Sequence, residues 1–306
     1  MSSQRATAFV PGHVTAFFSA HPADDPAVAG SRGAGVTLAD GVTVRVSAAD
    51  VAADGATGDA AAADAAAAAA TADSGSRTID GDRGSIGAVE DVLADLNATG
   101  ADVAVETDLP IGAGFGVSGA AALGAALAAN AAFDRGRSEN DLVRTAHAAE
   151  VGRGTGLGDV VAQARGGVPV RLEPGAPGVG ELDGVPASAR VEYVTFDELS
   201  TEEVLGGDTT ALSAAGEAAL DRLRADPRLP TLMDAARGFA RDADLLVPEV
   251  AEAVDAVDAA GGEAAMAMLG RTVFALGTGL SDAGYEPRAC RVDAAGARLV
   301  DDRDRG

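Results

Sequence analysis

The chain has 306 residues, 47% of them hydrophobic, which is enough apolar material for two domains or one large one. It carries 47 acidic against 23 basic residues, a formal net charge of −24, and every basic residue is an arginine. This balance argues against nucleic acid as a partner, because a phosphate backbone requires a basic surface. The lack of lysine also excludes a lysine-dependent P-loop and Schiff-base chemistry.

The acidic, lysine-free composition, with only 3% aromatic residues, is typical of a protein from a salt-rich, halophilic cytoplasm. Concentrated salt screens self-repulsion, so a large negative charge can maintain solubility without unfolding the chain. A GC-rich codon bias enriches Ala, Gly, Arg and Asp in the same way, and the sequence leaves both explanations open.

Several features predict a cytoplasmic protein without membrane contact. Cys290 is the single cysteine, so no intramolecular disulfide can form, in keeping with a reducing interior. The first 18 residues are a poor signal peptide, because Pro11 interrupts their apolar run. The Ala-rich run at 119–133 is shorter than the roughly 20 residues that a membrane span needs.

The N-terminal region alternates β-prone segments with turn signals. Strands are expected at 5–10 and 14–18, on either side of a Pro-Gly pair, and a hairpin at 36–46 that turns at Asp40–Gly41. Residues 52–76 consist of Ala, Asp, Gly and other small residues and cannot bury enough surface to fold alone. We therefore predict a surface insertion there.

The middle of the chain alternates helical patterns with short strands. Ser85 is a candidate cap for the first helix, Ser138 opens another, and glycines from 152 to 158 separate that one from the next. Helices are expected at 85–97, 117–132, from 138 and at 159–164, and a strand at 102–106.

The Gly/Pro-rich stretch 174–186 is the best candidate for a domain boundary, dividing the chain into 1–175 and 187–306. Both parts mix helices with strands, which indicates an α+β protein of two lobes. In the second part we expect strands at 190–196, 263–268, 287–292 and 297–300 and helices near 209–224, 231–243 and 248–260.

The strongest local signal is the glycine-rich stretch 108–123, which lies between a predicted strand and a small-residue helix. Gly112, Gly114, Gly116 and Gly119 allow positive φ angles and a close approach of N–H groups to a ligand. A helix N-terminus adds unpaired N–H donors and partial positive charge. The stretch therefore predicts a lysine-free anion cradle, the alternative being a turn that only permits close helix packing.

As a string, Gly114-x-Gly116-x-x-Gly119 also matches the dinucleotide-binding fingerprint. Its context differs, because Pro110 separates the strand from the loop. A second helix also follows where the dinucleotide fold has a strand with a ribose-binding acid. These differences argue against a Rossmann domain.

The same loop resembles the second motif of the GHMP kinases, P-x-x-x-G-x-G-x-S-x-A, through Pro110, Gly114, Gly116, Ser118 and Ala120. The resemblance implies a lobe like domain 2 of ribosomal protein S5, a ferredoxin-like second lobe, and an active site between them. It also implies that the loop, with Gly112 and Gly119, binds ATP, and that Ser118 helps to hold Mg²⁺. Val117 departs from the pattern, since many members carry a serine there.

The segment 148–167 resembles a second part of that family, with Glu150 ending one helix and Asp159 opening the next. The resemblance implies that Glu150 binds Mg²⁺ and that Asp159 accepts or orients the proton of an acceptor alcohol. The structural alternatives are a solvated helix end for Glu150 and a helix N-cap for Asp159.

Within that family, the chain resembles the archaeal pantoate kinases through FVPGHVTAFF at 9–18, GSRGAGVTL at 30–38 and MAMLGRTVFAL at 266–276. His13 stands where mevalonate-type members carry a lysine, and the resemblance places it near the acceptor. Arg32, between glycines, is a candidate receptor for the substrate carboxylate. A buried structural histidine and an ordinary surface arginine are the alternatives.

The resemblance implies an ATP- and Mg²⁺-dependent kinase that converts pantoate to 4-phosphopantoate in archaeal coenzyme A synthesis. The alternatives are a related kinase acting on homoserine, shikimate or mevalonate, and a binding module that has kept the loop without turnover. Small molecules are the expected partners, and a homodimer is compatible with the sequence. His21 and His147 lack a supporting motif and are expected to be structural.

Overall fold

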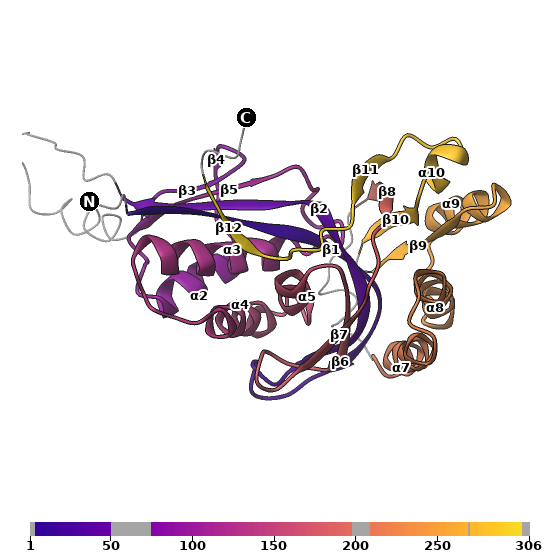
Figure 1. Ribbon diagram of the computed structural model, residues 1–306, viewed down its shortest axis with the longest axis horizontal. Coiled ribbons are helices and arrows are strands. Elements are labelled where there is room, and N and C mark those ends of the chain that lie inside the picture. Colours follow the sequence, from indigo (N-terminus) through magenta and orange to yellow (C-terminus); the bar gives the residue numbers. More distant parts are fainter. Residues whose placement is uncertain (1–3, 50–74, 198–208, 269, 302–306) are drawn as a thin grey trace, which may run out of the picture.

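The computed structural model describes residues 4–49, 75–197, 209–268 and 270–301, which form two β-sheets and the helices packed against them (Figure 1). The predicted α+β class is confirmed. Of the predicted insertion, residues 52–74 lie outside the described residues. None of the helices in the described ranges combines the length and the apolar composition that a bilayer crossing requires.

The larger sheet is built on two long antiparallel strands, β1 at Arg5–His21 and β2 at Gly30–Ala48. Both are buried along most of their length, and the larger sheet extends on either side of them. The order is β12 (Arg298–Val300), β1, β2, β5 (Ala101–Thr107), β3 (Arg77–Ile79) and β4 (Asp82–Arg83), while β6 (Val168–Glu173) pairs with β2 and with β7 (Glu181–Val185).

The hairpin predicted at 36–46 is wrong, because β2 continues straight through Asp40–Gly41. Gly41 pairs with Pro11 and Leu38 with Gly12, so the extra residues form an irregularity within a continuous pair of strands. The strand β2 is paired with β1 and, from Val42, also with β5. Pairing on both sides outweighs the local preference of Asp-Gly for a turn.

Four helices cover one face of this sheet (Figure 1). The central one, α3, lies almost wholly in the core, and its small residues allow close approach: a Cβ at Gly124 would lie 2.5 Å from Val44 Cγ2. Ser138 caps α4 through a capping box with Asp141, whereas α2 starts after Ile86 and not at the predicted cap Ser85. The helices are α2 (Gly87–Asp95), α3 (Val117–Ala132), α4 (Glu139–Arg153) and α5 (Asp159–Arg165).

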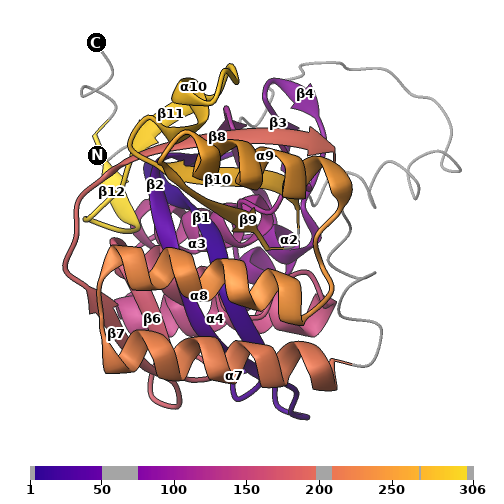
Figure 2. The same cartoon turned by 90° about the vertical axis from the view of Figure 1, so that its right-hand side faces the viewer.

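The second sheet is antiparallel and packs against α8, α9 and α10, whereas α7 packs against α8 and against β1 and β2 of the larger sheet. In Figure 2, α7, α8 and α9 face the viewer. The strand β10 of the second sheet was not expected from the sequence, although it forms part of the motif at 266–276. The strand order is β11 (Arg288–Arg291), β8 (Arg190–Asp197), β10 (Arg271–Leu276) and β9 (Glu263–Ala267), with helices α7 (Thr210–Ala225), α8 (Leu229–Asp242), α9 (Pro248–Ala259) and α10 (Gly279–Asp282).

The two sheets share one continuous core. The ring centroids of Phe115 and Tyr193 lie 4.8 Å apart, and the Met268 N–H donates to Thr15 O at 2.8 Å. The predicted lobe boundary at 174–186 stays a prediction. In strand pairing, β7 and the C-terminal β12 both belong to the larger sheet.

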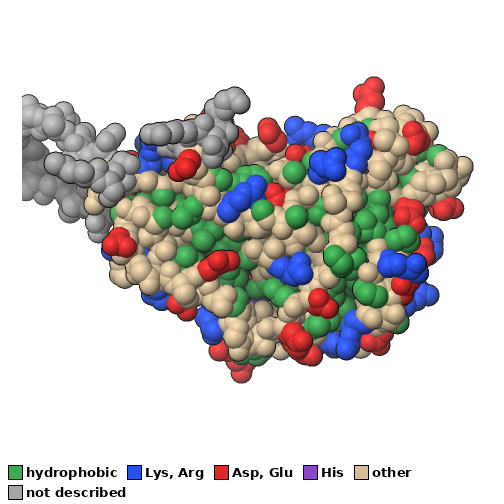
Figure 3. Space-filling model, viewed as in Figure 1, with side chains coloured by type: hydrophobic (Ala, Val, Ile, Leu, Met, Phe, Trp, Pro, Cys, Tyr) green, Lys and Arg blue, Asp and Glu red, His purple; other side chains and the backbone are tan. Residues whose placement is uncertain are grey.

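Charged side chains of both signs are distributed over the surface of the molecule. Figure 3 shows arginine and acidic side chains interspersed over one face. Some form ion pairs, such as Arg228 with Asp226 at 2.6 Å, but 23 bases cannot neutralise 47 acids. Exposed pairs of this kind contribute little stability individually, and the chain keeps a formal net charge of −24.

Candidate functional site

The glycine-rich loop joins β5 to α3 and lies between the two sheets. Gly112, Gly114 and Gly116 have φ angles of 83°, 87° and 64°, in the left-handed region that favours glycine. Gly116 is the N-cap of α3, and a Cβ there would lie 3.1 Å from Asp159 Cβ. Positive φ and lack of space both require glycine at this position.

Three carbonyl groups of the loop are held by donors from three different elements. Thr272 Oγ1 of β10 donates to Ala113 O at 3.0 Å, the His13 N–H of β1 to Phe115 O at 2.9 Å, and Gln163 Nε2 of α5 to Gly116 O at 2.9 Å. In contrast, the N–H groups from 114 to 118 have no hydrogen-bond acceptor among the described residues. The loop therefore offers unused donors to a ligand.

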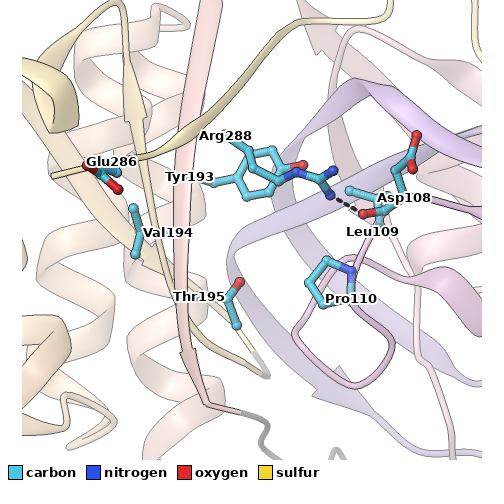
Figure 4. A pocket seen from close by; sticks show the side chains of 8 residues that line it. All are labelled: Asp108, Leu109, Pro110, Tyr193, Val194, Thr195, Glu286 and Arg288. Atoms are coloured by element: carbon cyan, nitrogen blue, oxygen red, sulfur yellow. Dashed lines mark hydrogen bonds between the residues drawn. The ribbon is translucent and has the colours of Figure 1, made fainter.

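The loop packs against the second sheet at one point and is open at another. A Cβ at Gly270 would lie 2.1 Å from Ala113 O, so the turn after β9 touches the loop there. Beside Pro110, a pocket of about 370 Å³ opens towards β8, lined in part by Thr195 and Arg288 (Figure 4). The start of the loop is thus accessible and not enclosed.

Ser118 and Glu150 form a pair of oxygen donors directly after the loop. Ser118 Oγ donates a hydrogen bond to Glu150 Oε1, and the glutamate side chain is buried. Burial raises the pKa of Glu150 to about 7, against the opposing effect of the Ser118 bond. A buried carboxylate that has no basic partner at bonding distance among the described residues is suited to a cation.

Asp159 opens α5 and is held by His13 of β1. His13 Nδ1 lies 2.7 Å from Asp159 Oδ1, and the aspartate side chain retains 19% exposure. Burial alone would raise the pKa of Asp159, but the His13 bond and the charge of Arg171 together lower it below its ordinary value. The aspartate is therefore ionised at neutral pH and able to accept a proton.

His13 itself is completely buried, and burial lowers its pKa despite the neighbouring carboxylate. The imidazole is therefore neutral, and its Nδ1–H donates to Asp159. Nε2 has no partner among the described residues, and a Cβ at Gly35 would lie 2.3 Å from it. The His13 ring thus contacts Asp159 through Oδ1. Direct contact of His13 with the acceptor substrate stays a prediction.

The two carboxylates approach each other around Gly156. A Cβ there would lie 2.9 Å from Glu150 Oε2 and 3.6 Å from Asp159 Oδ2. The oxygens not engaged by Ser118 and His13 therefore face the same small volume. Within the described ranges, no group of three or more Asp, Glu, His or Cys side chains surrounds a common point, so these two carboxylates do not form a closed protein metal cage.

Sequence reasoning missed Arg171, a buried arginine on β6 only 2% exposed. Its Nε and Nη1 atoms have no hydrogen-bond partner among the described residues, and burial lowers its pKa while the charge of Asp159 raises it. A Cβ at Gly158 would lie 2.5 Å from Ser31 Oγ and 2.7 Å from Arg171 Nε, so the two side chains adjoin. An arginine within the apolar run VPVRLE was the available sequence signal.

Arg32, in contrast, has its charge paired within the protein. Its Nη1 lies 2.7 Å from Glu217 Oε2, and its Nε donates to Leu172 O at 2.7 Å. Glu217 also accepts from Ser19 Oγ at 2.6 Å and lies 3.2 Å from His21 Nε2, so the cluster ties α7 to β1 and β2. The substrate-binding role of Arg32 stays a prediction.

The sequence of this chain is similar to proteins whose names state an activity. The profile named "GHMP kinases N terminal domain" matches residues 85–167. A pantoate kinase from Thermococcus kodakarensis is 36% identical, covering 88% of this chain and 86% of that protein. One from Methanospirillum hungatei is 31% identical, covering 90% and 89%.

The fold is similar to solved structures over nearly the whole chain. A structure described as "Phosphotransferase related to CoA biosynthesis pathway" has a TM-score of 0.78 and 30% identity, covering 97% of this chain and 98% of that one. Homoserine kinase from Cytophaga hutchinsonii has a TM-score of 0.66 at 16% identity, covering 98% of each chain, and shares the fold.

Proposed function

The chain belongs to the pantoate kinases, a family of the GHMP kinases, and from this premise we propose that it transfers the γ-phosphoryl group of ATP to pantoate. The product is 4-phosphopantoate, and the reaction is a step of coenzyme A synthesis in archaea. The observation that carries the proposal is the convergence of unused loop N–H groups, the Ser118–Glu150 pair and Asp159 at the N-termini of α3 and α5.

The loop N–H groups bind the triphosphate of ATP. Donors at the start of α3 lie where the helix dipole is positive, and five successive N–H groups from 114 to 118 lack an acceptor among the described residues. This arrangement replaces the lysine of other phosphate-binding loops, which the chain does not contain.

Ser118 Oγ and Glu150 fit a magnesium site. Both are hard oxygen donors, they are already in contact, and a dedicated cage is not needed because Mg²⁺ usually keeps waters and binds substrate phosphates. When bound, Mg²⁺ supplies neutralisation of the charge on the transferred phosphoryl group. Glu150 gives up its proton to bind the cation, as its pKa of about 7 permits.

Asp159 orients the acceptor hydroxyl and takes its proton through Oδ2, because Oδ1 is engaged by His13. The hydroxyl oxygen forms a bond to the γ-phosphorus, the bond from that phosphorus to the bridging oxygen breaks, and ADP leaves. His13 keeps the aspartate ionised and fixes its rotamer. Positioning and charge stabilisation supply most of the rate acceleration.

Arg171 binds the carboxylate of pantoate. A buried guanidinium with unused N–H donors is unfavourable unless an anion arrives to pair with it, and planar N–H groups match a carboxylate in bidentate fashion. Ser31, adjacent to Arg171, offers a further hydroxyl. Arg32 then acts indirectly, by holding β2 against α7 through Glu217.

A product assay across acids tests the proposal. ADP release is measured with pantoate, homoserine, shikimate and mevalonate in molar KCl, and the phosphorylated acid is identified by mass spectrometry. Pantoate is expected to give the highest kcat/KM. Equal or greater turnover of another acid would reject the substrate, and ATP binding without phosphorylation of any acid would indicate a binding module.

We also propose that the protein functions in a salt-rich cytoplasm. The net charge of −24 predicts self-repulsion that salt screens. The free energy of unfolding should therefore rise steeply between low and molar KCl. Full stability at low salt would favour the codon-bias explanation of the composition.

A further inference from the structure

Gln163 is a buried polar residue whose side chain reaches the phosphate-binding loop. It lies on α5 one helical turn after Asp159 and is completely buried. Its Nε2 donates to Gly116 O at 2.9 Å, an oxygen that also accepts the first hydrogen bond of α3, from the Ala120 N–H. Its own main-chain oxygen accepts from the Ala297 N–H at 3.0 Å, which anchors this part of α5.

The direction of one carbonyl fixes the direction of the next N–H. The C=O of Gly116 and the N–H of Val117 belong to the same planar trans peptide and point in opposite directions. Because Gln163 binds Gly116 O, the Val117 N–H must point away from Gln163. Thr272 and the His13 N–H hold Ala113 O and Phe115 O in the same manner and so orient the N–H groups of Gly114 and Gly116.

Stability does not account for this glutamine. Its Oε1 is buried and has no hydrogen-bond partner among the described residues. An unsatisfied buried polar atom costs free energy, so an apolar side chain of similar shape would be tolerated at least as well. The amide at this position therefore indicates a use that requires its N–H donor.

We propose that Gln163 is a positioning residue that orients the Gly116–Val117 peptide for ATP. This inference rests on the proposed function. Gly116 also contacts Asp159, since a Cβ on it would lie 2.9 Å from Gln163 Nε2 and 3.2 Å from Asp159 Cγ. The short helix α5 thus carries Asp159 and, through Gln163, also holds the Gly116–Val117 peptide at the start of α3. It thereby fixes the position of the Asp159 carboxylate relative to that peptide.

The test is Gln163→Met, which keeps the length of the side chain and removes the donor. We expect the dissociation constant of Mg-ATP, measured by calorimetry without pantoate, to rise about 3- to 10-fold, the range for one lost hydrogen bond. The KM for pantoate should stay within twofold and the Tm should not fall. Gln163→Asn, whose amide is too short to reach Gly116 O, should also weaken ATP binding and covers the case in which the Met variant does not fold.

Thr37→Val is the matched control, because Thr37 Oγ1 also donates from the core to carbonyl oxygens, and these acceptors, Gly167 O and Asp293 O, do not belong to the glycine-rich loop. It should lower the Tm and leave ATP affinity unchanged. If the folded Met or Asn variant binds Mg-ATP with wild-type affinity, the inference about Gln163 is wrong and the proposed function still stands. A wild-type protein that does not bind Mg-ATP overturns the proposed function and the inference with it.

Discussion

His13 Nδ1 and Asp159 Oδ1 lie 2.7 Å apart, although 146 residues separate them in the sequence. The first lies on β1, where it pairs with Thr37 of β2, and the second lies in the first turn of α5, so the pair forms only when the sheet and the helix have docked. The contact leaves a single aspartate oxygen, Oδ2, for the acceptor hydroxyl. This division of the two oxygens leads to the first two predictions.

Asp159→Asn should lower kcat by about 10²- to 10⁴-fold, because the amide cannot accept the hydroxyl proton. Nucleotide affinity should stay within a few-fold of wild type, since Asp159 does not belong to the phosphate-binding loop. Steady-state kinetics together with ATP-binding calorimetry distinguishes the two effects. A variant that retains more than a tenth of the wild-type kcat would show that Asp159 does not take part in proton transfer.

His13→Ala should move the acidic limb of the pH–rate profile to higher pH. The His13 bond lowers the pKa of Asp159, whereas burial raises it, so removal of the imidazole leaves burial as the dominant effect. The aspartate must be ionised to accept a proton, and a higher pKa therefore costs activity on the acid side. The profile of kcat/KM for pantoate measures this shift, and an unchanged limb would mean that His13 does not control Asp159.

Arg171→Met should raise the KM for pantoate about 10- to 100-fold, the loss expected for a charged hydrogen-bonding partner. Without pantoate, the same variant should be at least as stable as wild type, because it removes a buried charge that lacks hydrogen-bond partners at Nε and Nη1 among the described residues. Arg32→Met is the comparison: it breaks the pair with Glu217 and should lower the Tm with a smaller effect on KM. A reversed order of the two KM effects would assign the carboxylate to Arg32.

Glu150→Gln should stabilise the metal-free protein at pH 8 and make little difference at pH 5. The folded-state pKa of about 7 lies above the ordinary value of 4.5, so the folded state holds this proton more tightly than the unfolded state. The stabilising contribution is present below pH 4.5 and is lost as the pH rises to 7, on the order of 3 kcal/mol. Denaturant unfolding of both proteins in EDTA at the two pH values measures it, and an equal difference at both would contradict the raised pKa.

The sequence predicted the elements whose signals are local. The helix at 117–132 has the predicted bounds, and Ser138 caps α4 as its spacing with Asp141 suggests. The hairpin at 36–46 was wrong because strand pairing outside that segment decided its conformation. β10 was missed because its run of apolar residues has no alternating pattern, being buried on both faces.

The candidate site followed the same rule. The glycine spacing and the motifs singled out Ser118, Glu150 and Asp159, which the structure brings together. They could be found without the fold, because a motif consists of the residue types that the chemistry requires. Arg171 was missed because its one sequence signal, an arginine among apolar residues of a strand, is weak until the burial of the side chain and its missing hydrogen-bond partners are known. Likewise, the sequence could not show that Glu217, on a distant helix, pairs with Arg32.

Hydrogen exchange of the loop tests most directly whether its main-chain donors grip the triphosphate. In the free protein the N–H groups from 114 to 118 have no acceptor among the described residues and should exchange rapidly. Saturating Mg-ATP should slow exchange of these amides at least tenfold, as resolved by mass spectrometry of peptides across 109–121 or by NMR of glycine-labelled protein. Unchanged exchange of these amides, with nucleotide bound and protection found elsewhere, would contradict the phosphate-binding role of the loop.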